Sequence, residues 1–217
     1  YRISSKIFTV SNFSKSRIIH YFGEKKQIIV AYNGIRSDLL SLNSDLLDAK
    51  YKFNYILFVG NIKRYKGLDI LLKAIESTTL KLIIVGSIKY LRTSDREIEA
   101  RLRSNSNILI EEKIKDIELY SLMKNATILV QPSRYEGFGI PPLEAMFLGT
   151  PTIISDIPVF KEIYGDLPVV FFKDGDFLDL RNKIIELNLP VTVKDKVDSL
   201  FNYKLTASIL LDEMIGI

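Results

Sequence analysis

Two carboxylates flank a glycine-rich turn in the second half of the chain. Seven residues separate Glu136 from Glu144, and Gly137 and Gly139 follow the first acid. Glycines let backbone amides approach a ligand, and the start of a helix attracts anions. Because carboxylates beside such a turn can accept hydrogen bonds from hydroxyl groups, this spacing suits a sugar and a ribose.

The two acids also have simpler explanations, which the pattern leaves open. Glu144 can pair with the dipole of a helix that begins at Pro141 and Pro142, and Glu136 can be an ordinary surface acid. The segment is not a dinucleotide fingerprint, because Pro142 stands where a third glycine is needed.

Cations gather in an earlier loop, residues 60–67. Lys63, Arg64 and Lys66 follow Gly60, and a helix is predicted directly after this loop. Cations beside a helix N-terminus suit a diphosphate, and a solvated basic loop accounts for them equally well. The order Lys66-Gly67 and the glycine spacing exclude a Walker A loop.

A third loop, residues 156–162, carries two more acids. We expect Asp156 to cap a helix that begins near Pro158, because Asp is a favoured N-cap residue. Glu162 can pair with Lys161 or Lys173. These are structural roles, and no chemistry is assigned to either acid.

The elements that hold these loops follow a βα pattern. Short apolar, β-branched runs alternate with amphipathic stretches, which is typical of a parallel sheet covered on both faces. We expect strands at 6–10, 28–32, 55–59, 81–85, 107–110, 127–130, 152–155 and 169–172. We expect helices at 14–22, 68–76, 95–103, 116–124, 141–148 and 176–187, with one or two closing helices in 193–214. The fold class is therefore α/β, a Rossmann-like doubly wound sheet, whose ligands lie beyond the carboxyl ends of the strands.

Three regions are expected along the chain. Residues 41–52 follow Asn33-Gly34 and break the periodicity, so they are predicted to be a linker. Residues 53–217 form the doubly wound unit, whereas residues 1–40 hold only two strands and one helix, too few to bury a core. We interpret residues 1–40 as the end of another domain. Because the chain opens with Tyr1 and lacks a charged n-region, we expect a fragment of a longer protein without a signal peptide.

Composition excludes several classes of site. The 217 residues include no cysteine and one histidine, His20, which excludes disulfides, thiolate zinc sites, cysteine nucleophiles and His-rich metal sites. His20 is expected to be structural or exposed. The net charge of +4 is spread along the chain without a basic and aromatic stripe, so we expect no nucleic-acid partner, and a weak attraction to anionic lipid stays open. No apolar run approaches the roughly 18 residues of a membrane span.

The motifs, taken in order, resemble the C-terminal half of a retaining nucleotide-sugar glycosyltransferase of family 4, the group 1 glycosyltransferases of GT-B fold. The resemblance covers nearly the whole chain, and five segments carry it: 7–14, 28–35, 58–67, 135–146 and 149–166. The fourth is similar to the E-x7-E signature of the family. The resemblance implies that residues 1–40 are a remnant of the N-terminal domain.

The resemblance also implies roles for the site residues. Lys66 neutralises the donor diphosphate, and Arg64 or Lys63 compensates for Asn61, which stands after Gly60 where the family commonly has Arg. Glu136 contacts the transferred sugar near its reacting carbon, and Glu144 holds the ribose hydroxyls. The remaining donor-binding residues are the backbone amides of Gly137, Phe138 and Gly139 and, for the base, the loop around Ile114.

The implied reaction moves a hexose from a nucleoside-diphosphate sugar to a saccharide or lipid-linked acceptor with retention of configuration, without requiring a metal or another cofactor. The motif sequences are similar to those of mannosyl- and rhamnosyl-type enzymes of bacterial polysaccharide or lipopolysaccharide assembly. This similarity favours GDP-mannose over a UDP-hexose as the donor. The implied location is cytoplasmic, peripheral on the inner face of the membrane. Since the acceptor site belongs to the missing N-terminal domain, this fragment alone is expected to be inactive.

Two alternatives remain open at this stage. A nucleotide-sugar epimerase shares the GT-B architecture but needs further acids and histidines, and His20 lies far from the motif. A non-catalytic binding half that serves a partner subunit is the other alternative, and Asn61 in the Arg position favours it slightly.

Overall fold

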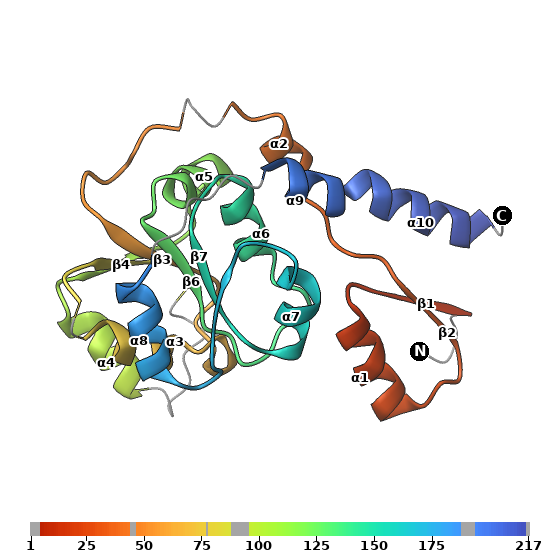
Figure 1. Ribbon diagram of the computed structural model, residues 1–217, viewed down its shortest axis with the longest axis horizontal. Helices are drawn as coiled ribbons and strands as arrows, with labels where there is room; N and C mark the ends of the chain where they lie inside the picture. Colours follow the sequence, from red (N-terminus) through yellow and green to blue (C-terminus); the bar gives the residue numbers. More distant parts are fainter. Residues whose placement is uncertain (1–4, 44–46, 77, 88–95, 188–193, 216–217) are drawn as a thin grey trace.

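The computed structural model describes residues 5–43, 47–76, 78–87, 96–187 and 194–215. Its main element is a six-stranded, all-parallel sheet in the order β5-β4-β3-β6-β7-β8 (Figure 1). The strands are β3 (Tyr55–Val59), β4 (Lys81–Val85), β5 (Ile108–Glu111), β6 (Ile128–Gln131), β7 (Thr152–Ser155) and β8 (Val170–Phe172). Strand order runs outward in both directions from the β3-β6 pair, which confirms the predicted doubly wound α/β fold.

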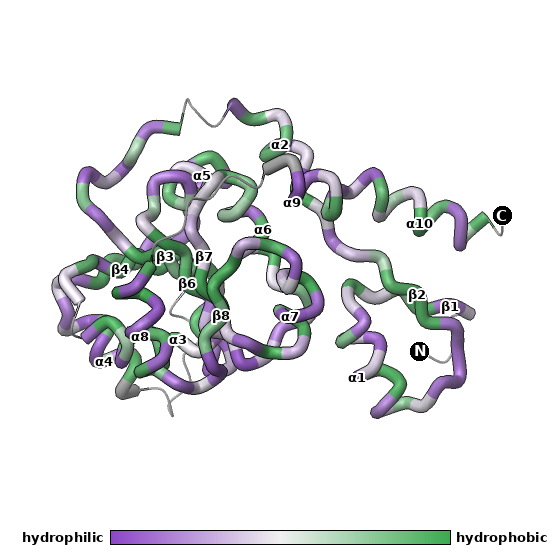
Figure 2. Tube along the Cα trace, in the orientation of Figure 1, coloured by the Kyte–Doolittle hydropathy of each residue, from purple (hydrophilic) through white to green (hydrophobic). Residues whose placement is uncertain are grey.

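Helices cover both faces of this sheet. The helices α3 (Leu68–Ile75), α4 (Arg96–Ser104) and α8 (Phe177–Ile185) pack on the face that carries Ile56 and Phe58. The opposite face, which carries Leu57 and Val59, is covered by α5 (Asp116–Lys124), α6 (Ile140–Phe147) and α7 (Pro158–Tyr164). Strands β3, β6 and β7 are therefore buried at every residue, which explains the apolar residues 55–59, 128–130 and 153–154 in the sequence (Figure 2).

A smaller unit precedes the main sheet. Strands β1 (Lys6–Thr9) and β2 (Gln27–Val30) pair in parallel through α1 (Asn12–Phe22) and form a separate two-stranded sheet. Helix α1 buries none of its residues, as expected for a unit too small to enclose a core. Helix α10 (Tyr203–Ile215) lies beside this unit (Figure 1), and Lys6 Nζ lies 2.8 Å from Glu213 Oε2.

The chain passes between the two units twice, and the two crossings lie side by side. The first leads from β2 to α2 (Ser37–Leu40), and the second leads from α9 (Lys194–Leu200) to α10. The Ile35 amide donates to the Phe201 carbonyl oxygen at 2.8 Å. A Cβ atom on Gly34 would lie 2.3 Å from the backbone carbonyl carbon of Asn202, so only glycine allows this approach. The described residues between 41 and 54 contain no helix or strand.

The expectation that Asp156 caps the helix beginning near Pro158 is wrong. The N-cap of α7 is Ile157, and no side chain bonds to that helix start. The Asp156 carboxylate instead accepts from the Asp174 amide at 2.9 Å and from Lys161 Nζ at 3.0 Å. The backbone that follows β8 supplies a donor to Asp156 that the local sequence does not reveal. None of the described helices combines the length and apolar character that a bilayer crossing requires.

Candidate active site at the switch point of the sheet

The loops that follow β3 and β6 meet at an ion pair. Lys66 Nζ lies 2.6 Å from Glu136 Oε1, and the two side chains are only 16% and 12% exposed. Because β3 and β6 are adjacent parallel strands, both loops leave the sheet at its carboxyl edge. A Cβ atom on Gly60 would lie 3.7 Å from Lys66 Cε, so the lysine stem passes close over this glycine.

The two loops are also joined through their backbones. Arg64–Lys66 form a 3₁₀ turn that ends at Gly67, whose φ is +68°. A Cβ atom on Gly67 would lie 1.8 Å from the Pro132 carbonyl oxygen, and the Arg134 amide donates to the Tyr65 carbonyl at 2.8 Å. The position of Lys66 is therefore set by the β6 loop as well as by β3.

A buried chain of hydrogen bonds orients Glu136. The Ser133 hydroxyl donates to Glu136 Oε1 at 2.8 Å, and Gln131 Nε2 donates to Ser133 Oγ at 2.9 Å. Ser133 and Gln131 are fully buried, and the Ser155 hydroxyl donates to the Ser133 carbonyl oxygen. No sequence pattern had indicated these polar residues, although buried polar side chains at the end of an apolar strand are unusual.

The glycine-rich turn presents unused backbone donors. Within the described residues, no hydrogen bond uses the N–H groups of Gly137, Phe138 or Gly139. Gly139 has a φ of +94° and precedes the first residue of α6, and its Cβ would lie 2.4 Å from the Phe160 ring. The turn therefore places free amides beside a helix start, where a negatively charged or oxygen-rich group is stabilised.

Glu144 lies on α6 and is buried, with 5% of its surface exposed. Burial raises the pKa of its carboxyl to about 7, the nearby Arg36 guanidinium lowers it, and Asp38 and Asp116 raise it further. In the part of the chain that the structure describes, its carboxylate accepts no hydrogen bond and forms no ion pair. Glu144 thus has unused acceptor capacity, which suits hydroxyl groups of a ligand.

Charged residues near Glu144 join the first crossing to α5. Arg36 Nη2 lies 2.9 Å from Asp38 Oδ2 and 2.5 Å from Asp116 Oδ2. The Tyr120 hydroxyl donates to Asp38 at 3.1 Å. No role was expected for these residues from the sequence, because their proximity depends on tertiary packing between segments about eighty residues apart.

The other predicted site residues on the 60–67 loop and near α5 are exposed or half-buried. Asn61 and Arg64 are exposed on the 60–67 loop, and Arg64 forms no ion pair with the residues described here. Ile114 is half-buried against the core shortly before α5. The same described residues contain no group of acids or histidines that could hold a metal ion.

Glu162 contacts α1 rather than a lysine, so its expected pairing with Lys161 or Lys173 is wrong. Its Oε1 accepts from the Asn12 amide at 2.6 Å, and its Oε2 accepts from the Phe13 amide at 2.8 Å. The first amides of a helix lack intrahelical partners and favour a negative charge. These amides bind Glu162 in preference to a flexible, solvated lysine.

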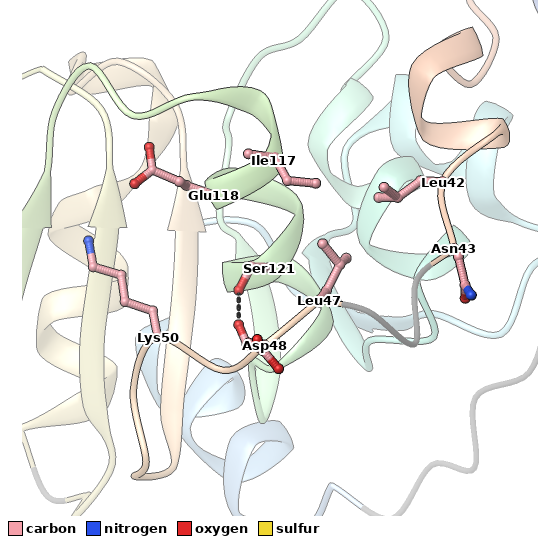
Figure 3. A pocket seen from close by; sticks show the side chains of 8 residues that line it. All are labelled: Leu42, Asn43, Leu47, Asp48, Lys50, Ile117, Glu118 and Ser121. Atoms are coloured by element: carbon pink, nitrogen blue, oxygen red, sulfur yellow. Dashed lines mark hydrogen bonds between the residues drawn. The ribbon is translucent and has the colours of Figure 1, made fainter.

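A separate groove of about 490 Å³ lies between α5 and residues 42, 43, 47, 48 and 50 (Figure 3). The Ser121 hydroxyl donates to the Asp48 carbonyl oxygen at 2.5 Å across it, and Lys50 Nζ lies 2.6 Å from Glu111. None of the predicted site residues lines this groove. The Lys66–Glu136 region is therefore the candidate active site.

Comparison with known proteins decides the family. The sequence pattern described as "Glycosyl transferases group 1" matches residues 44–188. The chain belongs to the group 1 glycosyltransferases. It is the C-terminal half of the GT-B architecture that these enzymes, classified as family 4, share.

Two curated relatives of this glycosyltransferase chain are a mannosyltransferase and a rhamnosyltransferase. It is 34% identical over 160 residues to the O-antigen chain mannosyltransferase RfbU of Salmonella typhimurium, covering 72% of this chain and 44% of that protein. It is 29% identical over 166 residues to the D-rhamnosyltransferase WbpZ of Pseudomonas aeruginosa, covering 73% of this chain and 43% of that protein. The chain thus spans less than half the length of these two relatives.

A solved structure agrees with the fold. The Anabaena protein HepE, in complex with UDP and glucose, matches all of this glycosyltransferase chain and 64% of its own, with a TM-score of 0.77 and 18% identity. At this identity the likeness establishes the GT-B fold alone. It includes the two-stranded unit as well as the six-stranded sheet, since 100% of this chain is covered.

Proposed function

We propose that this chain is the donor-binding half of a retaining hexosyltransferase that uses a nucleoside-diphosphate sugar. The observation that carries the proposal is the Lys66–Glu136 pair at the switch point, beside three unused backbone amides. A cation and helix-start amides suit a diphosphate, and a partly buried carboxylate suits sugar hydroxyls. Membership of the group 1 glycosyltransferases supports the same reading.

Lys66 binds the diphosphate in this proposal. It is the least exposed of the three loop cations, and its ammonium already faces the β6 loop. Exposed Arg64, with Lys63, adds positive charge to a loop in which Asn61 follows Gly60. The amides of 137–139 contact the sugar and the phosphates.

The two acids have separate tasks. Glu136 contacts the transferred sugar near its reacting carbon, and the hydrogen bond from Ser133 orients its carboxylate. Glu144 accepts from the ribose hydroxyls, and the base lies against the loop around Ile114. Since one acid serves the ribose, the pair is not the acid and base of a glycoside hydrolase.

Catalysis rests on preorganised electrostatics. Negative charge develops on the leaving diphosphate as the bond between the sugar carbon and the phosphate oxygen breaks. Lys66 and the helix-start amides stabilise this charge, and they are fixed before the reaction begins. The acceptor hydroxyl attacks from the same face of the sugar, and its proton leaves with the departing diphosphate.

The setting follows from the relatives. The likeness to an O-antigen chain mannosyltransferase and to a D-rhamnosyltransferase favours GDP-mannose over a UDP-hexose as donor. It also favours a saccharide or lipid-linked acceptor on the inner membrane face. The acceptor site belongs to the N-terminal domain of the whole protein. The 217-residue chain alone therefore binds donor without efficient transfer.

Calorimetric titration with GDP, UDP, GDP-mannose and UDP-glucose tests the proposal, with and without magnesium. Tight binding of one nucleotide that weakens in both Lys66→Ala and Glu144→Ala supports it. Absence of binding to all four by this chain and by the full-length protein overturns it. Loss of transfer in full-length Glu136→Gln, with nucleotide binding intact, separates an enzyme from a non-catalytic binding half.

A further inference from the structure

Helix α1 of the smaller unit lies against the glycine-rich turn of the site. Ser11, the N-cap of α1, is fully buried and donates its hydroxyl to the Gly137 carbonyl oxygen at 2.7 Å. The Ser14 hydroxyl lies 3.4 Å from the same oxygen. A residue adjacent to Glu136 is thus held by an element from outside the main sheet.

Aromatic contacts extend this attachment to both sides of Glu136. The Phe13 ring meets the Tyr135 ring edge-on, with 5.7 Å between centroids. The Tyr32 ring lies 6.2 Å from the Phe138 ring. Residues 135, 137 and 138 therefore all touch the segment 11–32.

Glu162 holds this segment in place. Besides accepting from the Asn12 and Phe13 amides, its carboxylate accepts from the Tyr32 hydroxyl at 3.0 Å. One side chain of α7 therefore fixes both the start of α1 and the tyrosine that packs on Phe138. Burial and the neighbouring Glu162 carboxylate together raise the pKa of Tyr32, so its hydroxyl stays protonated as a donor near neutral pH.

We propose that Glu162 is a positioning residue for the donor-binding turn and acts on it through α1 and Ser11. The C=O and N–H of a trans peptide point in opposite directions. Fixing the Gly137 carbonyl toward α1 therefore directs the Phe138 N–H away from α1, as an unused donor. The inference rests on the proposed function in one respect, namely that this N–H binds the donor.

A matched pair of variants separates positioning from general stability. Asp176 also accepts from two helix-start amides, those of Leu178 and Asp179, each at 3.1 Å, but at α8 on the other face of the sheet. We expect Glu162→Ala and Asp176→Ala both to lower the melting temperature. Only Glu162→Ala is expected to weaken nucleotide binding, by about tenfold, as for a lost charge-assisted contact.

Two further variants test whether Glu162 acts on the donor-binding turn through Ser11. Glu162→Gln keeps an acceptor oxygen and is expected to recover most of the affinity. Ser11→Ala leaves Glu162 in place and breaks its link to Gly137, so it is expected to weaken binding, and the double variant Ser11→Ala/Glu162→Ala adds little. These two single variants also carry the test if Glu162→Ala does not fold. Equal affinities of wild type, Glu162→Ala and Ser11→Ala overturn the inference.

A readout without nucleotide keeps the inference separate from the proposed function. The NMR chemical shifts of the amides of 137–139 are expected to change in Glu162→Ala and Ser11→Ala and to stay constant in Asp176→Ala. Unchanged shifts in both Glu162→Ala and Ser11→Ala overturn the positioning role. If neither the wild-type chain nor the full-length protein binds a nucleotide but the shifts change as expected, the proposed function fails and the positioning role stands.

Discussion

The ammonium of Lys66 lies 2.6 Å from the carboxylate of Glu136, although the two residues are seventy positions apart in the chain. An anion that binds Lys66 must compete with this carboxylate or displace it. In the proposed function, diphosphate binding to Lys66 leaves the Glu136 carboxylate to contact the sugar. This exchange of partners underlies the first two predictions.

Removing the lysine is expected to weaken binding of the donor diphosphate. Lys66→Ala removes a cation that is largely shielded from solvent, so we expect the Kd for the preferred nucleoside diphosphate to rise about tenfold or more. Calorimetry measures the change. Lys73→Ala, an exposed lysine on α3, is the control and should bind as the wild type does. Equal loss in both variants would contradict a specific role for Lys66.

Removing the charge of Glu136 is expected to separate binding from transfer. Glu136→Gln releases Lys66 and removes a negative charge, so affinity for free nucleoside diphosphate should stay constant or rise about threefold. Transfer by the full-length enzyme should fall about a hundredfold, because the carboxylate near the reacting carbon is lost. A parallel loss of affinity and transfer would show that Glu136 only supports the loop.

The raised pKa of Glu144 predicts a pH dependence of stability. Its folded-state pKa of about 7 exceeds the ordinary value of 4.5, so the folded state binds more protons between these values. Stability contributed by this group is therefore present below the ordinary pKa and is lost as pH rises toward the folded pKa. Glu144→Gln should flatten this slope, by at most about 1.4 kcal/mol per pH unit.

Urea unfolding of both proteins between about pH 5 and pH 8 measures the slope difference. Glu76→Gln, which changes an exposed acid, should keep the wild-type slope. If Glu144→Gln also keeps it, the carboxyl of Glu144 ionises near its ordinary pKa.

Two glycines with similar φ angles should respond differently to alanine. Gly67 has φ +68° and no room for a Cβ next to Pro132, whereas Gly175 has φ +80° and nothing within 4 Å. Gly175→Ala should lower the free energy of unfolding by about 1 kcal/mol, because only the strain of the left-handed conformation is added. Gly67→Ala should lower the free energy of unfolding by about 2–3 kcal/mol more, because the added methyl group forces the two site loops apart. Thermal unfolding measures both, and equal losses would contradict the contact.

Local patterns predicted the edge of the sheet at which the site lies. Alternation of strands and helices determines the end from which each loop leaves, so Lys66 and Glu136 were both expected beyond carboxyl ends. The order of the strands in the sheet could not be predicted in this way, because hydrophobic periodicity does not encode it. That β3 neighbours β6, and hence that these two residues touch, depends on packing across the whole chain.

The failed expectations share one physical cause. Asp156 and Glu162 were matched to partners nearby in sequence, but the structure supplies amides 18 and 150 residues away. Both contacts form only when segments that are distant in the sequence pack together, and the first amides of α1 need acceptors from outside the helix. Arg36 was missed for the same reason, since its partner Asp116 comes from another element.

The paired crossings of the chain restrict how its two units move. Because both connections lie along one line and share the bond from Ile35 to Phe201, twisting or pulling the units apart strains both connections at once. Rotation about that line strains neither. Such a rotation instead breaks the bonds from the Asn12 amide to Glu162 and from Ser11 to the Gly137 carbonyl oxygen, so these contacts fix the angle between the two units.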